Sequence, residues 1–158
     1  MACYKDLINR DRIHLSAIRQ YMKKYFYILG SLHAFTAIGA IPAGIGYLTD
    51  ITGRGMGASP ELLANSPLDS FLLPGLFLLL VNGLANVAAA WLSFSRNRWA
   101  GHAGMLLGTA LALWIIIQVA WISLSSLLQP LFLVIGLVNT FLGWRIMKYF
   151  KEINSKQP

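Results

Sequence analysis

The chain has 158 residues, of which 56% are hydrophobic and only 12% are charged, whereas charged residues make up about a quarter of an ordinary soluble domain. Its formal charge of +7 would favour a nucleic-acid-binding protein if the basic residues gathered on one folded surface, but they lie instead beside long apolar runs. Composition and charge placement therefore argue against nucleic acid as a partner and predict an integral membrane protein in contact with the lipid bilayer.

Residues 1–24 form a basic segment ahead of the first apolar run. Their apolar side chains fall on one helical stripe flanked by basic residues, although Asp11 interrupts it. That pattern is typical of an amphipathic helix lying on the inner surface of a membrane. Met22, followed by two lysines and then apolar residues, also resembles a natural start. Residues 1–21 are therefore either an ordered amphipathic helix or a dispensable extension.

Three long runs of the chain carry no charged residue, and they cover residues 25–49, 70–95 and 99–144. A helix needs about 20 apolar residues to cross the hydrocarbon core of a bilayer, so the third run is long enough for a hairpin of two helices. The predicted fold class is an all-α membrane protein, a four-transmembrane-helix bundle. The transmembrane domain is expected over residues 25–148, with spans at about 25–48, 71–94, 102–122 and 130–147.

The loop between the first two spans contains a helix-start signal. Ser59, Pro60 and Glu61 supply an N-cap residue, a proline at the first helical position and an early acid. We therefore expect a short interfacial helix near residues 60–64.

The basic residues predict the orientation of the chain. Only Arg54 lies in the first outer loop, and the other twelve of the thirteen lie before the first span, between the second and third, or after the fourth. The positive-inside rule then places both termini in the cytoplasm. We expect a multi-pass protein of the plasma membrane, N-in and C-in, with residues 149–158 as a cytoplasmic tail.

Small residues recur along each predicted span at helical spacing. Lipid tails provide no hydrophobic drive between helices, so close approach at glycine and alanine must help to hold the bundle together. Gly104 and Gly108 form a small-xxx-small pair. The expected packing residues are Gly30, Ala37, Gly44, Gly75, Gly104, Gly108, Gly136 and Gly143.

The same stripes carry polar side chains that form a candidate pocket. At a rise of 1.5 Å per residue, His33 and Asn86 each lie about 12 Å from the inner ends of their spans, and Asn139 lies close to that depth. Asn82 is one turn further out, and Gln118 is expected to face inward near the outer surface. The group fits either interhelical glue or a polar pocket in the inner half of the bundle that binds a lipid headgroup or solute.

No set of residues predicts catalysis, a cofactor or a metal site. The spans contain no Asp, Glu, Lys or Arg for ion coupling, His33 and His102 lie at different depths, and Cys3 is the only cysteine. The predicted function is that of a non-enzymatic protein acting through helix–helix association, as the partner of another membrane protein or as a homo-oligomer. The alternative is binding or transport of a small solute or lipid through the polar pocket.

Three segments carry a resemblance to known proteins. They are SPLDSFLLPG at residues 66–75, WIIIQ at 114–118 and LQPL at 128–131. Together they resemble a group of small prokaryotic four-span membrane proteins without an assigned biochemical activity. The resemblance covers about residues 25–147, implies a four-span membrane fold and supplies no catalytic residues. Residues 1–21 lie outside the resemblance, which favours the interpretation that they are a dispensable extension.

Overall fold

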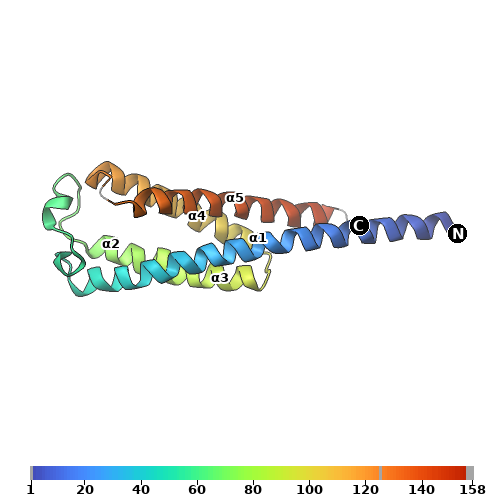
Figure 1. The fold of residues 1–158 in the computed structure, drawn as a ribbon, viewed down its shortest axis with the longest axis horizontal. Helices are drawn as coiled ribbons and strands as arrows, with labels where there is room; N and C mark the ends of the chain where they lie inside the picture. Colours follow the sequence, from blue (N-terminus) through green and yellow to red (C-terminus); the bar gives the residue numbers. More distant parts are fainter. Residues whose placement is uncertain (1, 125, 156–158) are drawn as a thin grey trace.

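The computed structural model describes residues 2–124 and 126–155, and their side chains from residue 20 onward. Within these ranges the chain forms helices and no strands. Four of the helical segments are long and apolar enough to cross a membrane, which confirms the prediction of an all-α, four-span fold. Figure 1 shows an elongated bundle in which the start of the first helix and the end of the last helix lie at the same end of the long axis.

The first helix, α1, runs without interruption from Ala2 to Thr49. Its membrane-spanning candidate is Gln20–Thr49, and the residues before it project beyond the other helices (Figure 1). No glycine or proline precedes Gly30, so nothing in the sequence breaks the helix between the basic segment and the span. The amphipathic pattern predicted for residues 1–21 rests on side chains that, up to residue 19, lie outside the described ones.

The loop after α1 contains two short 3₁₀ helices, η1 (Arg54–Met56) and η2 (Pro60–Leu63). The helix expected near residues 60–64 is thus a single 3₁₀ turn. At the start of the loop, the Asp50 carboxylate accepts hydrogen bonds from the Thr52 hydroxyl (2.6 Å) and the Gly55 amide (2.8 Å). These bonds favour the ionised form, the Thr52 hydroxyl most strongly, and they lower the pKa of Asp50.

The second span is divided into three parts, which the sequence did not predict. They are α2 (Leu72–Phe77), a π-helical turn η3 (Leu78–Leu84) and α3 (Ala85–Phe94). A π turn replaces the usual backbone pairing by hydrogen bonds five residues apart. The Asn86 side chain adds a hydrogen bond there, because its Nδ2 donates to the Val81 carbonyl at 3.1 Å.

The turn between α3 and the next helix keeps its backbone groups paired. The Asn97 amide donates to the Leu92 carbonyl and the Arg96 amide donates to the Ser93 carbonyl, each at 2.9 Å. This is the Schellman pattern, and it requires the left-handed backbone that Arg96 adopts at φ 53°. The next helix, α4, then runs over Ala100–Ile122.

The last helix, α5, covers Leu128–Ser155 and continues well past the expected end of the fourth span at residue 147. Most of the segment expected as a tail is therefore helical within the described residues. Its sequence to Ser155 contains neither glycine nor proline after Gly143, so the helix has no local reason to stop earlier.

The helices form two layers. One layer is α4 packed along α5, and the other is α1 packed along α2, η3 and α3 (Figure 1). The layers meet most closely near the α3–α4 turn, at the end of the bundle that we call the turn end; the opposite end is the loop end. The buried apolar cluster that joins them there is Met22, Phe26, Leu29, Ala100, Leu142 and Ile146.

Candidate functional site

A short, buried hydrogen bond joins α1 to α3 inside the bundle. His33 Nδ1 lies 2.6 Å from Asn86 Oδ1, and both side chains are no more than 1% exposed. An amide oxygen only accepts, so His33 Nδ1–H is the donor and, in the neutral ring, Nε2 is left as an acceptor. Because Asn86 also donates to Val81, its amide is engaged on both sides. Two of the five predicted pocket residues are therefore held in fixed orientations.

Several other buried polar atoms have no hydrogen-bond partner in the part of the chain that the structure describes. They are His33 Nε2, both amide atoms of Asn82, Asn139 Oδ1 and Trp114 Nε1. The four residues come one from each membrane-spanning segment. Unpaired polar groups away from water cost free energy.

Contacts between the helices show which of these residues share a depth. A Cβ built on Gly104 would lie 3.0 Å from the Leu29 side chain and 3.2 Å from Gly143 Cα, so these three positions are level. One turn toward the loop end, His33 follows Leu29 on α1 and Asn139 precedes Gly143 on α5, so the two lie at the same depth. His33 and Asn139 therefore form one tier, which the His33–Asn86 hydrogen bond extends to α3.

A second tier lies nearer the loop end. A Cβ on Gly83 would lie 2.8 Å from the Ile41 side chain, which places Asn82 about 12 Å beyond His33 along α1. Trp114 lies ten residues beyond Gly104 and so about 9 Å beyond the first tier. The unpaired atoms thus form two tiers about 10 Å apart along the bundle.

The chemistry of the two tiers selects an uncharged partner. The first tier offers acceptors, His33 Nε2 and Asn139 Oδ1, whereas the second offers the donors Asn82 Nδ2 and Trp114 Nε1 together with the acceptor Asn82 Oδ1. No Asp, Glu, Lys or Arg occurs in the charge-free runs that supply these side chains. Molecules with hydroxyl or amide groups satisfy both donors and acceptors without bringing a charge into the bundle.

The fifth predicted pocket residue does not belong to this group. Gln118 is only half-buried, and it lies one turn beyond Trp114 toward the loop end of α4. Trp114 is also half-buried, but Gln118, unlike Trp114, has no atom among the buried, unpaired ones.

Trp114 was missed by sequence reasoning. Hydropathy counts a mid-span tryptophan as apolar, and the only available signal was an indole N–H located away from the membrane interfaces, where tryptophan is usual. In the structure its ring stacks on Phe77, with centroids 4.4 Å apart, which fixes the indole between α4 and α2.

The glycines expected at helix contacts lie against neighbouring helices of the same chain. On α4 and α5, a Cβ on Gly108 would approach the Thr140 amide nitrogen to 2.6 Å, and one on Gly143 would approach the Met105 amide nitrogen to 2.5 Å. Other expected packing positions also contact their neighbours. Gly104 faces Gly143, Gly136 faces Ala112, Gly44 faces Leu79, Gly75 faces Tyr47, Gly30 faces Phe94, and Ala37 is 3% exposed.

The four long apolar helices define the class of this molecule: it is a multi-pass membrane protein. No family model, no curated protein and no solved structure matches the chain. The resemblance to small prokaryotic four-span proteins therefore stays a prediction. Among the described residues, no group of three His, Cys, Asp or Glu side chains is placed to hold a metal ion.

Proposed function

We propose that this chain is a non-enzymatic plasma-membrane protein that binds a small uncharged polar molecule between its four helices. The observation that carries the proposal is the set of five buried, unpaired polar atoms contributed by His33, Asn82, Trp114 and Asn139. The proposed ligand is a solute, or a lipid headgroup, that presents hydroxyl or amide groups to both tiers. A protein that stores this molecule and one that transports it across the membrane would contact it through the same buried donors and acceptors.

The proposed orientation is N-in and C-in. It is supported by the positive-inside pattern, in which Arg54 alone of the thirteen basic residues occupies the loop end. It is also supported by the position of the start of α1 and the end of α5 at the turn end of the bundle (Figure 1).

Structural glue alone would pair the amides with one another. Among the described residues no two of these amides pair with each other; Asn86 pairs with His33, and Asn139 Oδ1 and both amide atoms of Asn82 have no partner. In hydrocarbon, burying an apolar residue at positions 82 and 139 would cost less free energy than burying an unpaired amide. The unpaired amides are best explained by a molecule that they bind.

The association function expected from the glycine stripes has less support. Its premise was that some small residues would face outward, yet Gly104, Gly108 and Gly143 lie against the backbone of α4 or α5 in the same chain. Crosslinking in native membranes tests it directly. A specific partner protein, or a homo-oligomer at native expression, would restore association as the main function.

The binding proposal is tested with the variants Asn82→Leu and Asn139→Leu. Protein extracted from native membranes is analysed by native mass spectrometry for a retained small molecule, and its unfolding temperature is measured before and after exhaustive detergent washing. We expect wild type to retain a neutral molecule that each variant loses. After washing, the variants should be at least as stable as wild type, because each removes an unpaired amide.

Ser93→Ala is the matched control. Ser93 is as buried as the pocket residues, but its hydroxyl donates to the Ala89 carbonyl of its own helix at 2.8 Å. This variant should retain the molecule. An experimental map in which Asn82 and Asn139 are paired with protein groups, with no other density between the tiers, would contradict the proposal.

A further inference from the structure

The turn end of the bundle contains a recess between the start of α4 and the end of α5. Gly101 marks the level at which α4 begins to pack on α5, because a Cβ there would lie 2.9 Å from the Met147 amide nitrogen. Residues of α5 after Met147 continue to Ser155 without an α4 neighbour beside them. Because α5 extends further than α4 at this end, a recess of about 1210 Å³ remains, which we call the turn-end recess.

The lining of the turn-end recess is basic and aromatic. Its aromatic members include Trp99 and Trp144, which are 53% and 47% exposed. Cations lie over both rings: the Arg98 guanidinium carbon is 5.4 Å from the Trp99 centroid, and Lys148 Nζ is 5.8 Å from the Trp144 centroid. Cations held over exposed indole rings are typical of a membrane interface, where rings contact acyl chains and charges remain in water.

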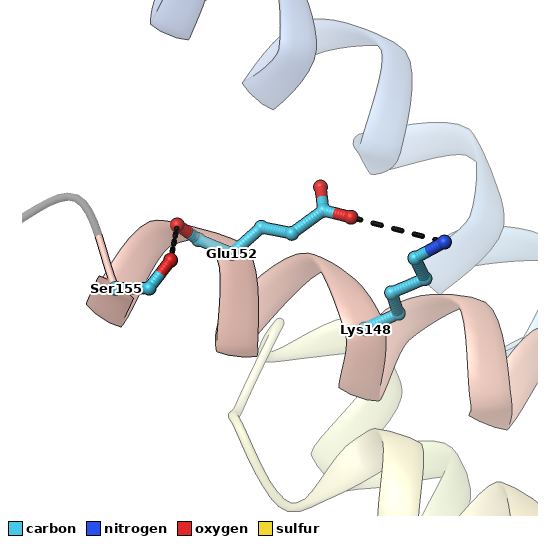
Figure 2. A network of polar contacts seen from close by, with 3 residues as sticks. All are labelled: Lys148, Glu152 and Ser155. Atoms are coloured by element: carbon cyan, nitrogen blue, oxygen red, sulfur yellow. Dashed lines mark hydrogen bonds and ion pairs between the residues drawn. The ribbon is translucent and has the colours of Figure 1, made fainter.

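The charges in the recess are unbalanced. Lysines and an arginine contribute three positive charges, and Glu152 is the only acidic residue that lines it. Figure 2 shows the Glu152 side chain reaching back to Lys148, with Oε1 4.0 Å from Nζ. Neither Arg98 nor Lys151 forms an ion pair with any residue that the structure describes. Two cations therefore remain free to contact an anion.

Helix lengths place this recess at the level of lipid headgroups. α5 has 28 residues and so a length of about 42 Å, whereas the hydrocarbon core is about 30 Å thick. Its last turns must therefore extend beyond the acyl chains at one end or both. The turn end is also the basic end of the molecule, which the proposed orientation puts at the anionic cytoplasmic leaflet.

We infer that the turn-end recess binds the headgroup of an anionic phospholipid. Arg98 and Lys151 contact the phosphate, Lys148 adds charge from beside Glu152, and Trp144 with Met147 packs against the upper part of the acyl chains. The lining supports a lipid more than a soluble anion, because the apolar side chains of Trp144 and Met147 lie beside the charged ones. This site is separate from the buried tiers, so either proposal can fail without the other.

The test uses the full chain in nanodiscs made from equal amounts of phosphatidylglycerol and phosphatidylcholine, with native mass spectrometry of the lipids retained on release. We expect wild type to retain phosphatidylglycerol in preference. The double variant Arg98→Gln/Lys151→Gln should reduce this preference by about fivefold for each charge removed. Glu152→Gln should raise it, because the only carboxylate of the recess is lost; a gain cannot come from misfolding.

The matched control is Lys23→Gln/Lys24→Gln, which removes the same charge from the same end of the molecule but from α1, outside the recess. It should leave the lipid preference unchanged. Equal loss in the control would show general attraction to the membrane surface and would overturn the inference. Retained preference in Arg98→Gln/Lys151→Gln would also overturn it. Displacement of the lipid by inorganic phosphate in the millimolar range would instead identify a site for soluble anions.

Discussion

The two layers of this bundle are held together by different means. Between α4 and α5, Gly108 and Gly143 allow backbone to approach backbone, so that a single added carbon would lie 2.6 Å and 2.5 Å from amide nitrogens. In the other layer, α1 and α3 are linked by side chains, namely the His33–Asn86 hydrogen bond and the Phe94 ring over Gly30. Backbone approaches backbone there where α1 passes η3, since a Cβ on Gly44 would lie 2.7 Å from the Leu79 amide nitrogen. Backbone contact cannot adjust to a larger residue, whereas side-chain contact can. We therefore expect the α4–α5 layer to be the rigid support, and the side-chain contact of α1 with α3, away from Gly44, to be the adaptable wall of the polar site.

The largest loss of stability is expected when the contact between α4 and α5 is disrupted. Gly143→Ala and Gly108→Ala should each destabilise the protein by about 2 kcal/mol or more, because the new carbon meets backbone that has no room to move. Steric trapping in bicelles measures the free energy of unfolding. Gly39→Ala is the control, since its nearest contact would be the Phe132 ring at an ordinary 3.6 Å. Equal losses in all three variants would contradict the role assigned to close backbone contact between α4 and α5.

A smaller effect is expected from the polar link of the other layer. His33→Leu and Asn86→Leu each leave the partner unpaired, and Asn86→Leu also frees the Val81 carbonyl of the π turn, so it should cost more. Interhelical hydrogen bonds in membranes contribute about 0.6 kcal/mol, with a maximum near 1.7. A double-mutant cycle should therefore give a coupling energy of about 1 kcal/mol. Strictly additive losses would mean that the two side chains do not interact.

The smallest effect concerns the loop that joins α1 to α2. The lowered pKa of Asp50, held down chiefly by the Thr52 hydroxyl, means that this carboxylate stabilises the fold above its unfolded pKa of about 3.9. That contribution is lost as the pH falls through the lower, folded value. The unfolding temperature of wild type should therefore decrease below about pH 4, and Asp50→Asn should not show this decrease. Thr52→Val should reduce the same decrease; an unchanged acid profile in both variants would count against this role.

Much of the fold could be predicted from the sequence, because each span is recognisable on its own. The charge-free runs around positions 25–49 and 70–95 indicated one helix each, and the structure has a membrane-length segment at both. Local signals near the helix ends were less reliable. The signal at Ser59, Pro60 and Glu61 indicated a short helix, which the structure has as a 3₁₀ turn, and the fourth span was expected to end near residue 147, whereas α5 continues to Ser155.

The candidate site was predicted less completely. His33 and Asn86 were expected at one depth, and the structure joins them with a hydrogen bond. The π turn that brings Asn86 to the Val81 carbonyl has no signature in hydropathy, and Trp114 was counted as apolar. Both depend on how neighbouring helices pack, which a stripe of residues on one helix does not specify.

By itself, the sequence determined that this chain enters a membrane and how many times its helices can cross it. Insertion depends on the composition of each helix separately, so a run of about 20 apolar residues is sufficient to predict a membrane-spanning helix. Only the tertiary structure decided which polar groups are paired and which remain unpaired. Those outcomes depend on the register between helices, where a shift of one residue moves a side chain 1.5 Å along the axis and about 100° around it. The unpaired atoms of Asn82 and Asn139, on which the proposed function rests, are a property of that register.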